Sequence, residues 1–511
     1  GGKLLACDPG GDRPDFANDG RIEDLPANNR LVIYELPTAW ASRTDLGGVE
    51  IGVGTFRDTR ALIEPGAEAA NFSGVEVMEP GRAHLLELGA NALELLPPAD
   101  SWTFREWGYA TSNYFAADFD LGFPNYNASP TSSLDLVALI AACHRNKIRF
   151  FLDVVMAFAT RYSLQNLNYL DFHVRRGTGD PEEKDYKGED RQDFGGKLFK
   201  YAYFTEAYDP LDGNRRSLSP SRQLLKANLA NWMETYRIDG VRIDSTKNIV
   251  NWDFLREFTT LGRDLFRQRW IDSGQPADSA DARFLTVGEE LPPRLGLVTT
   301  GRLDGLWNEP FMERVRCALL GENHHDDPDF ETTVQRMIDC SRVGYPDGSA
   351  AINYLTSHDV EGYRKERLFR FFWNNGFWLK NEKGEEYADT ERIARRVKLG
   401  FACLLTAVGV PMILAGEEFA DDHDRAITHP AKQSDPVNFD RASDGWRKGI
   451  IEYVSRLVKF RIASDALSVN DTEFIHADFT PGRRVLAWCR GRPGVDDPVV
   501  VVANFSEYDS A

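Results

Sequence analysis

Short runs of consecutive apolar residues recur along the chain, and segments with helical spacing of apolar positions separate them. Uninterrupted apolar runs are typical of strands that are buried on both faces of a parallel sheet. These runs predict strands at 31–36, 92–96, 148–155, 240–244, 284–289, 305–308, 352–357 and 411–415. Eight alternations of strand and helix predict an α/β fold, a closed (β/α)8 TIM barrel. A doubly wound open sheet is the alternative, but it would leave the last strand without a partner.

Three segments depart from this alternation. Residues 1–29 are polar and rich in Gly, Asp and Pro, which predicts a linker or the tail of a missing N-terminal domain. The connection at 160–222, after the third strand, far exceeds the usual length of roughly 2–6 residues and predicts an inserted subdomain. From 466 to 511 short alternating strands predict an all-β C-terminal domain, cut short here. The catalytic barrel is then expected over 30–465.

The composition argues against several classes of partner. The 511 residues carry a formal net charge of −19 with dispersed Lys and Arg, so we expect no nucleic acid and no membrane surface as a partner. A neutral carbohydrate is compatible with this charge. The six cysteines form no CxxC pair, which favours reduced thiols over disulfides or a zinc site. The oligomeric state and the compartment are left open, with the cytoplasm favoured.

Charged residues cluster where the predicted strands end. In a barrel these ends open on one face, where barrel enzymes place their catalytic groups. Burying charges at four strand ends costs several kcal/mol unless function or pairing compensates, so we interpret them as a site rather than as separate structural ion pairs. The residues are Asp153, Arg242, Asp244, Glu289, His358 and Asp359.

These residue types suit the cleavage of a glycosidic bond, which needs one ionised and one protonated carboxyl. Arg242 lies two residues before Asp244, so both side chains face the same side, and the guanidinium keeps Asp244 ionised as a nucleophile. Glu289 ends an apolar strand with little local positive charge, which favours a carboxyl that holds a proton. Double displacement predicts that these two carboxyls lie about 5–5.5 Å apart. Asp359 could hold sugar hydroxyls and stabilise the distorted ring.

The motifs around these residues resemble glycoside hydrolase family 13, the α-amylase superfamily, from about residue 31 into the C-terminal β domain. The matching segments are 152–155 (LDVV), 240–244 (GVRID), 287–291 (VGEEL) and 357–359 (SHD). The resemblance implies that Asp244 is the nucleophile, Glu289 the acid/base and Asp359 the stabiliser of the transition state. It also implies that Arg242, His358 and Tyr109 contact the sugar, with Tyr109 stacked on a glucose face. We expect Asp153 and Phe158 to complete the substrate-binding set.

The chain departs from the family pattern at three positions. Ala157 and Phe158 stand where the family usually has an Asn that ligates calcium and a His that contacts sugar, and Asn248 replaces another His. Phe158 either stacks on the sugar or only fills the gap. We expect no metal and no cofactor. The run 421–424 (DDHD) has a metal-like composition but is interpreted as a solvated loop.

The segment 107–116 resembles the corresponding loop of branching and debranching enzymes, which shifts the expected substrate toward α-1,6 branch points. The favoured function is a retaining hydrolase of α-glucosidic bonds in starch- or glycogen-like polysaccharides. One alternative is a 1,4-α-glucan branching transglycosylase with the same covalent intermediate. Another is a catalytically silent barrel that binds glucan or a protein. An unrelated barrel chemistry would need a cofactor motif, and none is found in the sequence.

Overall fold

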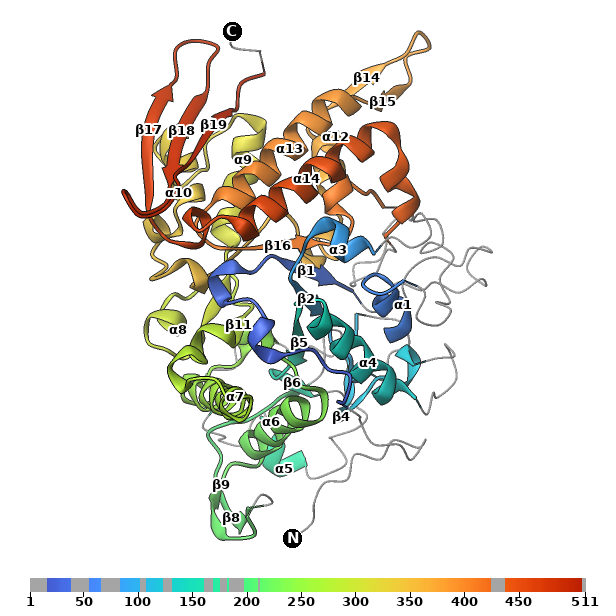
Figure 1. Cartoon of the computed structure of the whole chain (residues 1–511), viewed down its shortest axis with the longest axis vertical. Coiled ribbons are helices and arrows are strands. Elements are labelled where there is room, and N and C mark those ends of the chain that lie inside the picture. The colour runs from blue at the N-terminus through green and yellow to red at the C-terminus, as the bar shows by residue number, and fades with distance from the viewer. Residues whose placement is uncertain are drawn as a thin grey trace.

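A closed parallel barrel forms the centre of the molecule (Figure 1). The computed structural model describes residues 16–37, 55–65, 83–101, 107–122, 131–159, 169–174, 182, 197–209, 212–423 and 437–507. The barrel strands are β1 (Ile33–Leu36), β2 (Ala92–Leu95), β5 (Arg149–Val155), β10 (Gly240–Asp244), β11 (Leu285–Gly288), β12 (Gly305–Trp307), β13 (Ala351–Tyr354) and β16 (Val410–Leu414). Their order around the barrel is β1-β16-β13-β12-β11-β10-β5-β2. The first strand pairs with the last, Ile33 opposite Met412, so the barrel prediction is confirmed and the open-sheet alternative is wrong.

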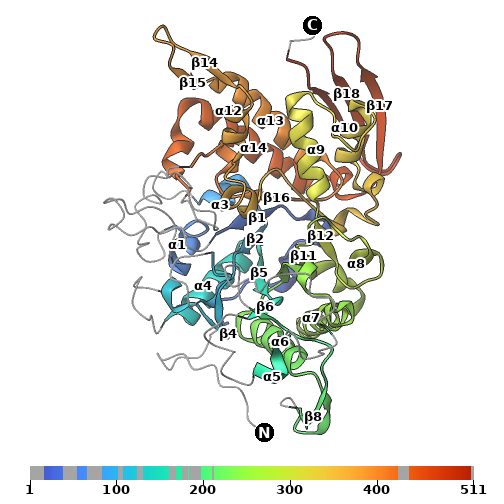
Figure 2. The ribbon, with the colours of Figure 1, turned by 180° about the vertical axis from the view of Figure 1, so that it is seen from behind.

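Helices surround the barrel, as Figures 1 and 2 show. The longer ones are α4 (Ser132–Arg145), α6 (Pro220–Asn231), α7 (Trp252–Asp272), α9 (Glu309–Leu320), α13 (Thr390–Thr406) and α14 (Gly445–Ala463). In α7, the Asn251 side chain accepts the Phe254 N–H and caps the helix, and Phe254, Phe258 and Phe266 face inward. Among the described helices, none combines the length and the apolar character that crossing a bilayer requires.

Two apolar layers explain the uninterrupted hydrophobic runs. One lies inside the barrel and includes Ile33, Phe151, Val287, Ile352 and Met412. The other fills the space between the strands and the helices. Because successive residues of a strand point to opposite sides, both sides of each strand must be apolar.

The seventh strand ends earlier than predicted. It stops at Tyr354 rather than residue 357, because Ser357 already caps the helix α11 (His358–Gly362) by accepting the Val360 N–H. This cap places His358 and Asp359 in the first turn of a helix rather than on a strand.

Smaller elements lie at the two ends of the molecule. An antiparallel sheet of β17 (Thr472–Asp478), β18 (Val485–Arg490) and β19 (Val499–Asn504) packs beside α9 and α10 (Phe330–Ile338) in both views (Figures 1 and 2). Within 160–222, the described part includes α5 (Tyr169–Phe172), β7 (Lys197–Leu198), and the hairpin of β8 (Thr205–Tyr208) and β9 (Arg215–Leu218). The domain boundaries remain predictions.

Candidate active site

Inward-facing side chains change from apolar to charged along the barrel. Alternate residues of a strand face the same side, so each charged residue lies one layer above an apolar one, toward the carboxyl end of its strand. The pairs are Ile33 and Glu35, Ala92 and Glu94, Phe151 and Asp153, and Val287 and Glu289. The barrel therefore has an apolar floor and a charged layer at the face where barrel enzymes carry their sites.

Arg242 joins three carboxyl groups of this layer. Its Nη1 donates to both oxygens of Asp153, at 2.9 and 2.7 Å, and to Asp244 Oδ1 at 3.2 Å. Its Nη2 donates to Glu289 Oε2 at 2.8 Å. Burial alone would lower the pKa of Arg242, but Asp153, Tyr109, Glu289 and Asp244 outweigh it and raise that pKa well above its usual value. The guanidinium is therefore a permanent positive charge beneath the site.

The surroundings of Glu289 differ from the sequence expectation. Little positive charge was predicted near it, yet Arg242 lies 2.8 Å away and the Ser245 N–H donates to the same oxygen at 2.9 Å. The prediction was wrong because the cation comes from the neighbouring strand β10, 47 residues away in the sequence. A reason for Glu289 to hold a proton must therefore come from the charge of the whole cluster.

Tyr109 and His358 extend the same network. The Tyr109 hydroxyl donates to Asp153 Oδ2 at 2.5 Å, lies 2.9 Å from His358 Nε2 and accepts from Arg242 at 3.0 Å. Burial raises the pKa of Tyr109 well above its usual value, so the hydroxyl keeps its proton. The ring stacks on His358, with centroids 5.4 Å apart, and Tyr109 as a whole is buried.

Solvent exposure divides the predicted residues into two sets. The side chains of Asp244, Glu289 and Asp359 keep 9%, 12% and 19% of their surface exposed, whereas Asp153, Arg242 and His358 keep none. Hydrogen bonds and ion pairs connect all six residues, with Asp359 joined through His358 Nε2 at 3.8 Å. The first set is therefore open to a molecule bound at the barrel mouth, whereas the second set is shielded from it.

Phe158 does not join this group. It begins the short strand β6 (Phe158–Ala159), its side chain is buried in the main core, and its carbonyl accepts the Tyr114 hydroxyl at 2.9 Å. Of the two roles considered for Phe158, this placement corresponds to filling the gap.

The sequence reasoning missed two buried glutamates. Glu35 on β1 accepts the His358 backbone N–H at 3.1 Å, and its Oε1 lies 2.6 Å from His358 Nδ1. Glu94 lies opposite Glu35 on β2. Burial raises the pKa of Glu94 to about 8, and burial together with Glu94 raises that of Glu35. The available signal was a lone charged residue within each apolar run, LVIYEL and ALELL.

The predicted solvated loop at 421–424 is wrong for its first three residues. Asp421 is fully buried and accepts from Arg441 at 2.8 Å, and Asp422 accepts from Arg370 at 2.5 Å. Burial, followed by nearby arginines, lowers the pKa of His423 to about 3. Asp424 lies outside the described residues. Both acidic side chains thus form ion pairs with arginines. These arginines lie 20 and 52 residues away in the sequence, so the pairs could not be predicted from the local pattern.

One group in the described part of the chain has ligand atoms close enough for a metal ion. It consists of His324, His325 and Asp326, whose ligand atoms lie within 4.8 Å of one another in the turn between α9 and α10. None of the predicted catalytic residues belongs to it.

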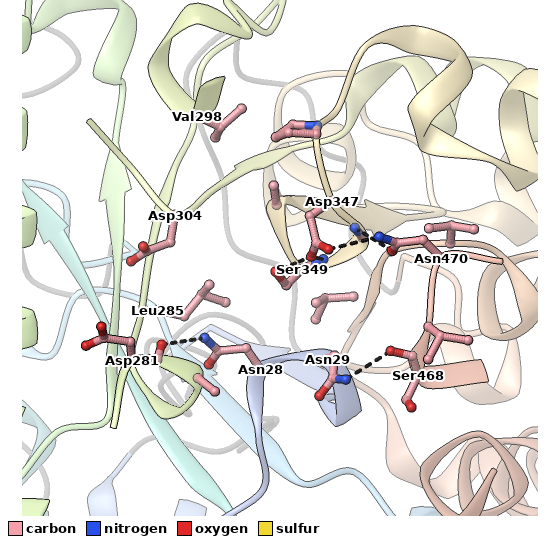
Figure 3. Close-up of a pocket in the computed structure, with 18 of the residues that line it drawn as sticks. Asn28, Asn29, Asp281, Leu285, Val298, Asp304, Asp347, Ser349, Ser468 and Asn470 are labelled. Atoms are coloured by element: carbon pink, nitrogen blue, oxygen red, sulfur yellow. Dashed lines mark hydrogen bonds between the residues drawn. The ribbon is translucent and has the colours of Figure 1, made fainter. Parts of the chain in front are cut away.

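A pocket of about 660 Å³ lies at the opposite end of the barrel (Figure 3). Its wall includes Leu285 and Val410, which begin β11 and β16. Its polar groups largely bond to one another: the Asn470 amide donates to Asp347 at 2.9 Å, and Asn29 donates to the Ser468 carbonyl at 3.0 Å. None of the predicted site residues lines this pocket. We interpret it as a gap in the packing between the floor of the barrel and the flanking segments.

Comparison with known proteins adds relatives of defined activity. No family model matches the chain. A pullulanase of Bacillus subtilis is 25% identical over 439 residues, which is 80% of this chain and 53% of the relative. A 1,4-α-glucan branching enzyme of Thiobacillus denitrificans is 29% identical over 192 residues, which is 37% of this chain and 22% of the relative. The chain therefore spans about half the length of the pullulanase.

Solved structures show the same fold. A pullulanase from an Anoxybacillus species, crystallised with maltotetraose, superposes with a TM-score of 0.65 at 17% identity, over 94% of this chain and 66% of that one. An Anoxybacillus α-amylase superposes with a TM-score of 0.60 at 16% identity, over 94% and 88% of the two chains. Both likenesses extend over the barrel and its flanking elements.

Proposed function

Because the chain belongs to the α-amylase superfamily, glycoside hydrolase family 13, we propose that it is a retaining hydrolase of α-glucosidic bonds in starch- or glycogen-like polysaccharides. One observation carries the proposal. Two carboxyls at the mouth of the barrel, Asp244 and Glu289, are held on different nitrogens of one buried guanidinium, that of Arg242. Such a pair matches the two roles that double displacement requires.

In the proposed reaction, the Asp244 carboxylate attacks the anomeric carbon while the bond to the leaving oxygen breaks. Glu289 gives its proton to that oxygen. A water then attacks the anomeric carbon, its proton passes to Glu289, and the bond to Asp244 breaks. Asp244 is ionised and Glu289 protonated again, so the cycle closes without a cofactor.

The charge of the cluster supports a proton on Glu289. Arg242 is the shared partner of Asp153, Asp244 and Glu289, and one positive charge cannot balance three negative charges in a site shielded from water. Burial raises the pKa of Asp153 to about 6 despite its contact with Arg242, which illustrates the shortage of positive charge. Glu289 keeps part of its side chain exposed and can exchange its proton with solvent.

Asp359 completes the proposed site. It lies in the first turn of α11 and has the most exposed side chain of the three carboxylates. We expect it to accept hydrogen bonds from sugar hydroxyls and to stabilise positive charge on the distorted ring.

A branching transglycosylase is the second candidate, and the similarity to branching enzymes favours it. Its first half-reaction is the same, but a glucan hydroxyl replaces water as the second nucleophile. A pullulanase matches 80% of this chain, which supports hydrolysis and α-1,6 branch points. A catalytically silent barrel is the least supported, because all three carboxyls are kept together.

The test is turnover of amylose, amylopectin and pullulan, with product linkages determined by NMR. Asp244→Asn should lower kcat by roughly 10⁴-fold or more, since it removes the nucleophile. Asp253→Asn, at an exposed position on α7, is the matched control. Release of reducing ends supports hydrolysis, whereas loss of iodine staining without such release supports branching. Unchanged turnover in Asp244→Asn would refute both enzymes, and a first product of β configuration would refute retention.

A further inference from the structure

Glu35 binds two nitrogens of the same residue. Its Oε2 accepts the backbone N–H of His358 at 3.1 Å, and its Oε1 lies 2.6 Å from the ring Nδ1. Both side chains are fully buried. β1 and the start of α11 are 323 residues apart in the sequence, so this contact exists only because the barrel closes.

We propose that Glu35 is a positioning residue of the active site, which fixes the imidazole of His358 by accepting two hydrogen bonds that a carboxylate can accept together. The inference rests on the proposed function, because the orientation of His358 matters for turnover only if sugar is processed beside it. Glu35 itself is too deeply buried to touch substrate.

The surrounding aromatic rings fix the plane of the His358 imidazole, but they do not determine which way round the ring lies in that plane. Trp107 and Trp307 meet the imidazole edge to face, with centroids 5.0 and 5.7 Å away. A half-turn of the ring about its bond to Cβ would preserve this packing while exchanging nitrogens with carbons. The carboxylate of Glu35 distinguishes the two orientations, because only one of them presents Nδ1 to an acceptor.

The fixed orientation reaches the catalytic groups. With Nδ1 on Glu35, the other nitrogen Nε2 lies 2.9 Å from the Tyr109 hydroxyl and 3.8 Å from Asp359 Oδ1. Tyr109 in turn contacts Asp153 and Arg242. A change at Glu35 therefore alters the hydrogen bond to Tyr109 and the environment of Asp359.

The charged neighbours of Glu35 come from several elements. Glu94 on β2 and Asp359 on α11 favour its protonated form, and Arg242 on β10 favours its ionised form. At 2.6 Å, a proton lies between Oε1 and Nδ1 in either case. The acceptor for the backbone N–H is the second oxygen.

Glu35→Gln separates positioning from simple packing, because the amide has nearly the same shape. Two donors need two acceptors, and an amide offers only one. Either the backbone N–H loses its acceptor, or the amide NH₂ faces Nδ1 and shifts the ring proton to Nε2. Both outcomes change which hydrogen bonds His358 can make to Tyr109.

Glu94→Gln is the matched control. Glu94 lies opposite Glu35 in the strand register and is equally buried, but neither of its oxygens has a hydrogen-bond partner among the residues that the structure describes. At neutral pH burial keeps it protonated, so the amide replaces a group of the same charge and shape.

The experiment compares kcat, KM and the pH profile of kcat/KM for the two variants on the α-glucan that the wild type processes. We expect Glu35→Gln to lower kcat/KM by about 10–100-fold, the range found when the carboxylate that orients a metal-ligating His is removed, and to change its pH profile. Glu94→Gln should stay within about twofold. A wild-type profile in Glu35→Gln, or equal losses in both variants, would overturn the proposal.

A second readout does not depend on activity. In protein labelled with ¹⁵N-histidine, we expect the Nδ1 proton of His358 to be strongly downfield in the wild type, as a short hydrogen bond requires. This signal should disappear in Glu35→Gln but not in Glu94→Gln, whereas the signal of the equally short His144–Asp19 contact should persist in both variants. Absence of the signal from the wild type would overturn the proposal even if Glu35→Gln does not fold. A wild type that shows the signal but processes no α-glucan would instead refute the proposed function.

Discussion

At the scale of single residues, the central feature is the sharing of one cation. The planar guanidinium of Arg242 offers separate nitrogens to separate carboxyls, with Nη1 on Asp153 and Asp244 and Nη2 on Glu289. An ammonium group is a single point of charge and cannot reproduce this fork. The positions of Asp244 and Glu289, the pair proposed as catalytic, therefore depend on arginine and not only on a positive charge.

Arg242→Lys tests this dependence. We expect kcat/KM on α-glucan to fall by about 100-fold or more, because a lysine that reaches Asp153 removes the hydrogen bond that Arg242 Nη2 donates to Glu289. Steady-state kinetics checks the loss, and Arg267→Lys, in an exposed ion pair with Asp281, is the control. Retention of most activity by Arg242→Lys would show that charge alone suffices.

The three carboxyls that we propose as catalytic could be found from the sequence because each lies at, or shortly after, the end of an apolar run. The partners of these groups could not, since they come from distant strands. Glu35 contacts a histidine 323 residues away, and Arg242 reaches Glu289 across 47 residues. The same reason explains why Asp421 and Asp422 were assigned to a solvated loop: their arginines lie on other segments.

At the scale of elements, burial decides what the sequence reveals. Strands with both faces buried give continuous apolar runs, so all eight barrel strands were predicted within a few residues. Within 466–511, β17 gives a weak sequence signal, because its side chains alternate between partly and fully exposed and carry Glu, His and Asp. A strand at the edge of a small sheet needs few apolar residues, and its pattern resembles that of a loop.

The end of α4 carries a pH-dependent contact. His144 lies between Asp19, at 2.6 Å, and Asp239, at 2.9 Å. Burial alone would lower the pKa of His144, but Asp239 and Asp19 outweigh it and raise the pKa to about 9. The folded state therefore binds this proton more tightly than the unfolded chain, in which the pKa is 6.5.

It follows that His144 makes its full contribution to the free energy of unfolding below pH 6.5, and that this contribution is lost as the pH rises through 9. We expect the free energy of unfolding to fall by roughly 3 kcal/mol over this interval through His144, and the fall to be absent in His144→Gln. Urea unfolding at pH 6, 7.5 and 9 measures it, with His325→Gln at an exposed position as the control. Parallel pH curves for the wild type and His144→Gln would contradict the assignment.

At the scale of the whole molecule, a buried arginine joins the C-terminal sheet to the barrel. Arg490 on β18 donates to the carbonyls of Thr406, which ends α13, and of Val469 and Asp471. Phe330 on α10 adds aromatic contacts with Phe479 and Phe505. Backbone carbonyls, rather than carboxylates, are thus the partners of this cation.

Arg490→Met should weaken this connection. Methionine fills part of the volume but leaves buried carbonyls without donors, which costs about 1–3 kcal/mol. We expect a lower Tm with little change in kcat/KM, because the contacts of Arg490 include none of the residues proposed as catalytic. Thermal unfolding followed by circular dichroism, together with kinetics at 25 °C, checks both. A Tm equal to that of the wild type would show that the aromatic contacts hold the sheet alone.

The pairing of β1 with β16 limits when the barrel can close during synthesis of the chain. β1 leaves the ribosome early, yet its second neighbour is the last barrel strand to be synthesised. Until residues 410–414 emerge, β1 and β13 each expose a row of free backbone groups that can pair with another chain. A stalled or prematurely released chain therefore has two unpaired strand edges at which it can aggregate. Insertion of β16 between β1 and β13 pairs the backbone groups of both edges at once.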